Sequence, residues 1–168
     1  TTTHFFGWYE AGEKVVPPKT VSFIMAGDVM LDRNVSHKYL PVGFKTIFAK
    51  LGDRTFWGTD AKLFNLEGPI SDIPTIDEIS GSLVFNFPPE TIDLLKYLKL
   101  NAVSLANNHS HNAGTKGLAP TYRLLDEAGI QAIGGPSDQD TTKIGSIDGN
   151  GITIKIIGVH ALTSYPDI

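Results

Sequence analysis

The sequence predicts an α/β domain built on a largely parallel sheet, because short apolar segments alternate with helical segments along most of the chain. Segments 21–26, 61–66 and 101–106 are nearly continuous apolar runs, as expected for strands buried on both faces. Each run ends at a polar or turn-forming motif. A chain of 168 residues with 41% hydrophobic content is long enough for one such domain with its own core.

The first strand, 21–26, closes at Gly27-Asp28, and the stretch after it is helical or irregular. The second strand, 61–66, runs into Glu67 and a Gly68-Pro69 turn. Residues 71–82 are rich in Ser, Asp, Pro and Thr, which predicts a loop.

Two amphipathic helices separate the remaining strands of the predicted sheet. The first, 90–98, follows Pro88-Pro89, which favours a helix start. The second begins within 114–117 and stops at Gly129, before a strand at 130–133. The apolar stripe of the first helix consists of Ile92, Leu94, Leu95 and Leu98.

The two ends of the chain differ from its middle. Segments 143–147 and 152–159 flank Asp148-Gly149-Asn150-Gly151, which predicts a β-hairpin. Residues 1–20 have no sustained period and end in a Pro-Pro element, so they are interpreted as a tether or leader preceding a domain at 21–168. The aromatic residues of this leader could equally pack on the domain or form a partner strand. They are Phe5, Phe6, Trp8 and Tyr9.

Composition excludes several classes of function. The formal net charge of −4 gives no global basic field for nucleic acid or anionic lipid, so a local positive feature such as a metal would have to hold an anionic substrate. The absence of cysteine excludes disulfides and thiolate metal sites. No apolar run approaches the roughly 18 residues of a membrane span.

Polar residues follow three of the predicted strands, namely Asp28, Glu67 and Asn107-Asn108-His109. Parallel strands bring their carboxyl ends together, and α/β sheets bind ligands there. Carboxylate, amide and imidazole groups suit a hard or borderline divalent ion. Taken singly, Asp28 could be a turn or helix cap, Glu67 a solvated carboxylate and the paired Asn residues turn formers. The set of three motifs is more specific than its parts.

These motifs resemble the CapA/PgsA family of bacterial capsule or poly-γ-glutamate synthesis proteins, and the resemblance covers about residues 20–160. That family is similar to the calcineurin-like metallophosphoesterases, which implies a sandwich of two sheets flanked by helices. The segments that carry the resemblance are Gly27-Asp28-Val29-Met30-Leu31-Asp32-Arg33, Asn65-Leu66-Glu67-Gly68-Pro69-Ile70, Ser104-Leu105-Ala106-Asn107-Asn108-His109, and Gly114, Gly117 and Leu118.

The resemblance implies a role for each matching residue. Asp28 would bind the first metal, Glu67 would bridge two metals and Asn108 would be the amide ligand, with Mn, Zn, Fe or Mg as the divalent ion. His109 would protonate a leaving group or steady the transition state. Arg33 would contact an anion, although it could equally be a surface residue capping the next helix.

Two departures from the family pattern bear on catalysis. Family members commonly carry Asp three residues after the His, where this chain has Asn112, so an orienting carboxylate is replaced by a neutral amide. The family's later imidazole ligands would lie beyond Ile168, so only the N-terminal part of the fold is expected here. His111 and His160 could fill that gap, or be an exposed loop residue and a hydrogen-bonded strand-end residue.

Three functional hypotheses follow. The chain is a metal-dependent, phosphoesterase-like hydrolase in cell-envelope polymer synthesis, a non-catalytic assembly or polymer-binding protein on the same fold, or one part of a site completed by a second polypeptide. The resemblance implies an extracellular location, with a membrane tether absent from this chain. Expected partners are an anionic polymer or a phosphate-containing small substrate, and other capsule-synthesis membrane proteins.

Overall fold

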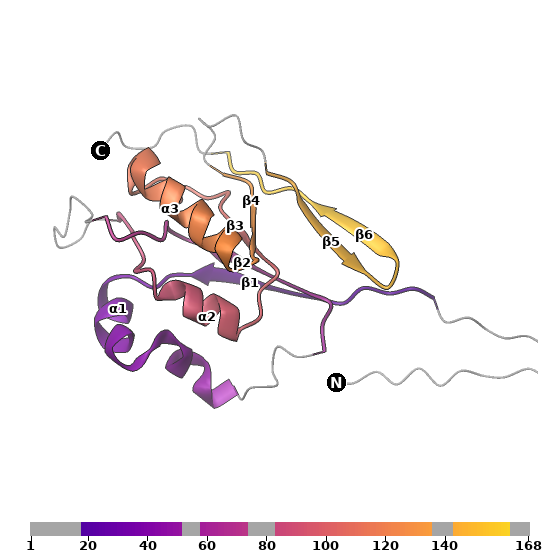
Figure 1. Cartoon of the computed structure of the whole chain (residues 1–168), viewed down its shortest axis with the longest axis horizontal. Helices are drawn as coiled ribbons and strands as arrows, with labels where there is room; N and C mark the ends of the chain where they lie inside the picture. The colour runs from indigo at the N-terminus through magenta and orange to yellow at the C-terminus, as the bar shows by residue number, and fades with distance from the viewer. Residues whose placement is uncertain (1–17, 52–57, 74–82, 136–142, 162–168) are drawn as a thin grey trace, which may run out of the picture.

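The computed structural model describes residues 18–51, 58–73, 83–135 and 143–161. Its centre is a sheet of four parallel strands in the order β1-β2-β3-β4, which confirms the predicted α/β class (Figure 1). The strands are β1 (Phe23–Val29), β2 (Ala61–Leu66), β3 (Ala102–Ser104) and β4 (Gln131–Ile133).

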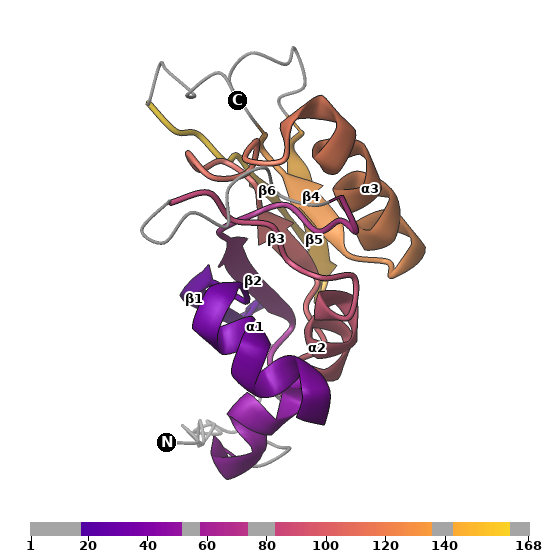
Figure 2. The same cartoon turned by 90° about the vertical axis from the view of Figure 1, so that its left-hand side faces the viewer.

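The helices gather on one face of this sheet (Figure 2). Helix α1 is followed by two 3-10 segments, so the chain from Arg33 to Leu51 is helical except at Gly43. Both predicted amphipathic helices are present as α2 and α3. The bounds are α1 (Arg33–Tyr39), η1 (Leu40–Val42), η2 (Phe44–Leu51), α2 (Thr91–Tyr97) and α3 (Gly114–Glu127).

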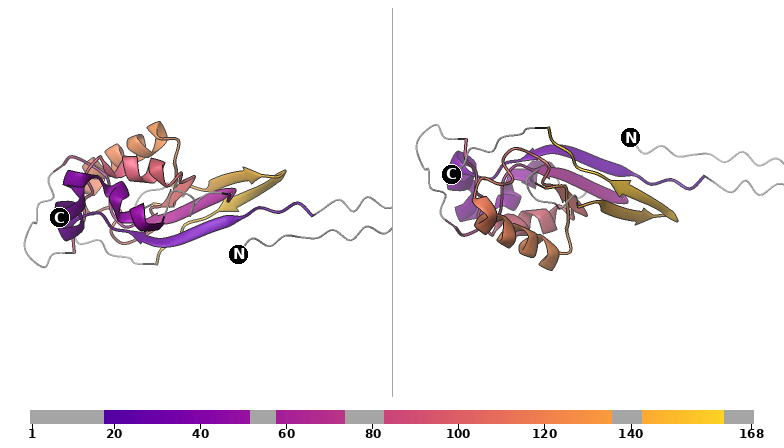
Figure 3. Two further views of the ribbon diagram at one scale, coloured as in Figure 1. Left: turned by 90° about the horizontal axis from the view of Figure 1, so that it is seen from below. Right: turned by 90° about the horizontal axis from the view of Figure 1, so that it is seen from above.

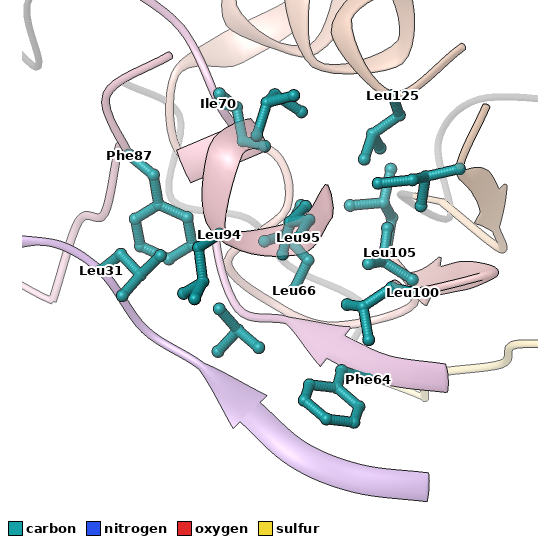
Figure 4. Packing of buried hydrophobic residues seen from close by; sticks show 14 of the residues in the cluster. Leu31, Phe64, Leu66, Ile70, Phe87, Leu94, Leu95, Leu100, Leu105 and Leu125 are labelled. Atoms are coloured by element: carbon teal, nitrogen blue, oxygen red, sulfur yellow. The ribbon is translucent and has the colours of Figure 1, made fainter. Parts of the chain in front are cut away.

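The main core lies between these helices and the sheet (Figure 4). Leu66 of β2, Leu95 of α2 and Leu125 of α3 are each fully buried there. Full burial of such a side chain contributes about 1.5–3 kcal/mol. Successive side chains of β2 point to opposite faces of the sheet. Phe64 belongs to the main core on the helix side, and Leu63 belongs to a second cluster on the other face.

That second cluster lies beneath a hairpin formed by β5 (Gly145–Gly149) and β6 (Ile152–Ile156), which runs beside the sheet in Figure 3. Ile156 of β6 packs against Leu63, Ala102 and Ile133. The hairpin turn is Asn150-Gly151 with φ angles of 50° and 73°, as a two-residue type I′ turn requires. The hairpin prediction is confirmed.

The prediction that the first strand is buried on both faces is wrong. Met25 of β1 is 68% exposed, and Ala26 and Asp28 are exposed as well. β1 is an edge strand, and the buried residues against which Ile156 of the hairpin packs come from β2, β3 and β4. An apolar sequence therefore predicted the strand correctly but not the covering of its second face.

Strand lengths also differ from the prediction. β1 continues to Val29, so Gly27-Asp28 lies inside the strand, and its pairing with β2 shifts register between Ala26 and Asp28. This irregularity sets Asp28 opposite Asn65. β3 and β6 are shorter than predicted. The predictions for residues 1–17 lie outside the described residues, among which no helix is long and apolar enough to cross a membrane.

Candidate metal centre at the carboxyl ends of the strands

The parallel register places three polar residues side by side across the sheet. Asp28 of β1 pairs with Asn65 of β2, which pairs in turn with Ser104 of β3. Glu67 follows β2 directly, and its backbone N–H donates to Val29 O at 3.2 Å, which keeps the two strand ends together. The strand-end motifs that are distant in sequence therefore meet at one edge of the sheet.

Asn65 joins the two carboxylates. Its side-chain Nδ2 donates to Asp28 Oδ1 at 2.8 Å and also to Glu67 Oε2. One amide nitrogen carries two hydrogens, so a single Asn can orient both acids. Asp28 and Glu67 thus lie on either side of the same amide group.

Asn107 holds Asn65 in this orientation. Asn107 Nδ2 donates to Asn65 Oδ1 and to Leu66 O, both at 2.9 Å. Its Oδ1 accepts the backbone N–H of His109 at 2.9 Å. Because Asn65 Oδ1 is the acceptor here, its NH₂ group has to face the carboxylates. Asn107 is 8% exposed, and its buried side chain fixes the orientation of Asn65.

The pKa of the Glu67 carboxyl is raised in this cluster. Partial burial raises the pKa of its carboxyl above the ordinary value, and the nearby charge of Asp28 raises it further. The hydrogen bond from Asn65 and the neighbouring His109 act in the opposite direction. Two acids that repel each other and stay fixed are suited to binding a cation.

His109 reaches the same place from the turn after β3. Its Nδ1 lies 2.9 Å from Asn112 Oδ1, and its Nε2 lies 3.9 Å from Glu67 Oε1. The imidazole packs against the ring of Phe85, with 4.4 Å between ring centroids. The side chains of His109 and Glu67 are 14% and 17% exposed, so the imidazole and the carboxylate face each other at a largely covered position.

Arg33 packs on the same Phe85 ring. It opens α1 with a φ of 53°, and its guanidinium carbon lies 5.0 Å from the centroid of the Phe85 ring. The cap of α1 is Asp32, which accepts Arg33 N–H at 2.6 Å and Asn86 N–H at 2.8 Å. Arg33 therefore packs on the Phe85 ring beside the site, and its contact with an anion stays a prediction.

Two of the other predicted residues, Asn108 and His111, are close in sequence to His109. Asn108 and His111 are half-buried in the turn that carries His109. His160 follows Gly158, which packs on Ala106 just before that turn. Among the described residues, no three His, Asp or Glu side chains converge closely enough to hold a metal ion. A metal bound here would therefore also need amide or water oxygens as ligands.

Three supporting residues were missed by the sequence prediction. Asn65 and Asn107 belong to the quoted motifs but had no role in the predicted site, and Phe85 had none either. Asn65 could have been recognised as a site residue because it is a polar residue near the end of the apolar run 61–66. Nothing in the sequence pointed to Phe85, because its contact with His109 depends on how two segments distant in sequence pack together.

Comparison with known proteins places the chain among bacterial envelope polymer proteins. Residues 22–167 match the family described as bacterial capsule synthesis protein PGA_cap. The capsule biosynthesis protein CapA of Bacillus anthracis is 24% identical over 159 residues, which is 90% of this chain and 38% of that protein.

Two further relatives point the same way. The PGA biosynthesis protein CapA of Bacillus subtilis is 24% identical, with 86% of this chain and 38% of that protein aligned. A probable polyglutamine synthesis accessory protein of Mycobacterium tuberculosis is 29% identical, with 72% of this chain and 40% of that protein aligned. The chain thus spans about two fifths of the length of these curated relatives.

Proposed function

Because the chain belongs to the PGA_cap family of bacterial capsule synthesis proteins, we propose that it takes part in making a capsule or poly-γ-glutamate at the cell envelope. The names of its relatives support this setting. Under this proposal the site faces the outside of the cell. Its partners are an anionic polymer or a phosphate-containing small substrate, together with membrane proteins of capsule synthesis.

The strand-end cluster would serve as a divalent metal centre, with Asp28, Glu67 and Asn108 as ligands and Mn, Zn, Fe or Mg as the ion. The observation that carries this proposal is the Asn65 amide, which holds the carboxylates of Asp28 and Glu67 side by side. Burial raises the pKa of Glu67 and repulsion from Asp28 raises it further, and a cation between the two fixed acids would relieve that repulsion.

A metal ion supplies hydrolytic chemistry when bound, since it polarises a phosphoryl oxygen and lowers the pKa of a bound water to about 7. The protein's own groups would position that chemistry. Asn65 and Asn107 keep the two acids in place, and the Phe85 ring supports the imidazole of His109. The proposed activity is phosphoesterase-type hydrolysis.

Metal binding is the first test. The full chain, stripped with EDTA and dialysed, is titrated with Mn²⁺ and with Zn²⁺ by calorimetry and by thermal unfolding. We expect saturable binding, with a stabilisation of about 2.7 kcal/mol at a hundredfold excess over Kd. Asp28→Asn and Glu67→Gln should each weaken binding at least tenfold.

The matched control is Asp126→Asn, which removes an exposed carboxylate in the last turn of α3, at the opposite end of the strands. It should bind metal as the wild type does. Equal binding by all variants, or no binding by the wild type, would contradict the metal centre.

A second candidate function is favoured by the sparse ligand set, since no three acidic or imidazole side chains converge among the described residues. In this alternative the fold supports envelope assembly or polymer binding without catalysis. Hydrolysis of bis-p-nitrophenyl phosphate by the Mn²⁺-loaded chain separates the two. Turnover that Asp28→Ala abolishes supports the hydrolase, whereas metal binding without turnover supports the assembly role.

A further inference from the structure

The helical segment 33–51, which runs through α1, η1 and η2, carries four cationic side chains and no Asp or Glu. This charge stands out in a chain whose formal net charge is −4. The other helical stretches are balanced, because residues 90–99 and 114–127 each carry two acids and two cations. Segment 33–51 is therefore a local concentration of positive charge. Its cations are Arg33, Lys38, Lys45 and Lys50.

The lysine charges of this segment are not neutralised by the described part of the protein. Lys38, Lys45 and Lys50 are exposed, and none of them is ion-paired with an Asp or Glu among the described residues. Lys38 Nζ lies 5.2 Å from the centroid of the Tyr39 ring, a contact that leaves its charge in place. Asp32, which precedes the segment, already accepts two backbone N–H groups. An anion from outside can therefore reach the lysines.

The apolar side of the segment is used by the core. Phe44 is buried, and Tyr39, Ile47 and Phe48 pack against the main core. The segment lies on the helix side of the sheet, beside α2 (Figure 2). A helix that binds a bilayer inserts its apolar face. Because that face is turned inward here, the exposed lysines suit a water-soluble polyanion better than a lipid surface.

The segment begins at the candidate site. The guanidinium carbon of Arg33 lies 5.0 Å from the centroid of the Phe85 ring, and the same ring packs against His109. Further along, Lys45 and Lys50 are about 10 Å apart along η2, at a rise of about 2.0 Å per residue. Charges that are spaced along a surface suit a chain with many anionic groups better than one small anion.

We propose that segment 33–51 is a docking surface for a flexible polycarboxylate chain, which it holds by charge with one end of the surface at the strand-end cluster. This inference rests on the proposed function, because it assigns a surface to the anionic polymer named there. A polymer with one carboxylate per residue can place charges against unevenly spaced lysines. Such binding is electrostatic, so it depends on salt and needs no metal ion.

Polymer binding is measured on the full chain after EDTA treatment, by the fluorescence anisotropy of labelled poly-γ-glutamate. We expect saturable binding that weakens as salt rises from about 10 mM to about 150 mM, since the Debye length falls from about 30 Å to about 8 Å. The triple variant Lys38→Gln, Lys45→Gln, Lys50→Gln should bind about tenfold more weakly. Arg33 stays unchanged because it contacts the Phe85 ring of the site.

The matched control removes the same charge from other elements. Lys19→Gln, Lys116→Gln, Lys155→Gln changes three exposed lysines, which precede β1 or lie in α3 and β6. This variant should bind the polymer as the wild type does. Equal loss in the two triple variants would overturn the docking surface, because total charge and not its position would then explain binding. No binding by the wild type would overturn it as well.

An anionic lipid surface is the alternative occupant, because Leu40, Val42 and Leu51 of the segment are exposed. Sedimentation with phosphatidylglycerol vesicles tests it. Vesicle binding that the lysine substitutions in segment 33–51 abolish, together with polymer binding that they leave unchanged, would overturn the polymer as occupant.

Calorimetry with Zn²⁺ on the same variants distinguishes this inference from the metal centre. Loss of polymer binding in Lys38→Gln, Lys45→Gln, Lys50→Gln with unchanged Zn²⁺ binding supports the docking surface. Absence of Zn²⁺ binding in the wild type, with polymer binding that this variant loses, would contradict the metal centre and support the docking surface.

Discussion

At the scale of single residues, amide side chains organise this site more than charges do. Asn65 orients Asp28 and Glu67, Asn107 orients Asn65, and Asn112 orients His109. An Asn offers donors and an acceptor at fixed positions without changing the net charge. A chain of such contacts holds two acids and an imidazole at the same edge of the sheet.

Glu67 leads to a prediction on pH dependence. Its pKa is raised in the folded protein, so the folded state holds this proton more tightly than the unfolded chain does. Below the ordinary glutamate pKa of 4.5 both states are protonated. Above it the unfolded chain ionises first, so the contribution of Glu67 to stability falls as pH rises through the higher folded pKa.

Glu67→Gln, which keeps an acceptor oxygen for Asn65, should therefore gain stability over the metal-free wild type as pH rises from about 4 to 8. Urea unfolding in EDTA measures the difference at each pH. Glu90→Gln makes the same chemical change at an exposed position and corrects for the loss of one negative charge. A wild type that gains on Glu67→Gln with rising pH would contradict the prediction.

At the scale of elements, periodicity and turn chemistry predicted most of the fold. The Asn150-Gly151 turn could be predicted because it depends only on the residues that form it. The same holds for the end of the helix at Gly129, where Ile130 N–H donates to Leu125 O at 2.9 Å. Exposure of β1 was missed because it depends on which elements cover the sheet.

For the site, the sequence predicted the position of the residues but not the contacts that support them. Asp28, Glu67 and His109 could be placed together because parallel strands end at one edge. The supporting contacts were not, because the bonds of Asn107 and Phe85 depend on side-chain orientation and on loop packing. Strand topology therefore gives the position of the cluster, and tertiary packing gives its chemistry.

Helix α3 stabilises the turn that carries Glu67 through one hydroxyl. The fully buried Thr121 accepts Ile70 N–H at 2.8 Å, and its hydroxyl hydrogen is within reach of Ile70 O and Gly117 O. Thr121→Val keeps the shape and leaves the buried Ile70 N–H without this acceptor, so it should cost about 1–3 kcal/mol in urea unfolding. Thr121→Ser keeps the hydroxyl and should cost less. Equal losses in the two variants would show that the hydroxyl is not the cause.

At the scale of the whole molecule, Gly134 marks the point where three distant segments meet. It follows β4 with a φ of 71°, and a Cβ built on it would lie 2.7 Å from Ala106 Cβ and 3.1 Å from Gly158 O. Its N–H donates to Lys143 O at 2.8 Å. The sheet, the turn that carries His109 and the chain beyond β6 are therefore joined at a position with no room for a side chain.

Gly134→Ala should destabilise the protein in two ways. A left-handed backbone costs about 1–2 kcal/mol for a residue with a Cβ, and the forced separation from Ala106 and Gly158 should add about 1–3 kcal/mol. Gly129→Ala is the matched control, because Gly129 has a similar φ of 69° and nothing within 4 Å of its added Cβ. Urea unfolding of both variants isolates the contribution of the contact. Since that contact adjoins the turn of His109, Gly134→Ala should also weaken Zn²⁺ binding, whereas Gly129→Ala should not; equal effects of the two substitutions would mean that the backbone conformation alone explains the loss.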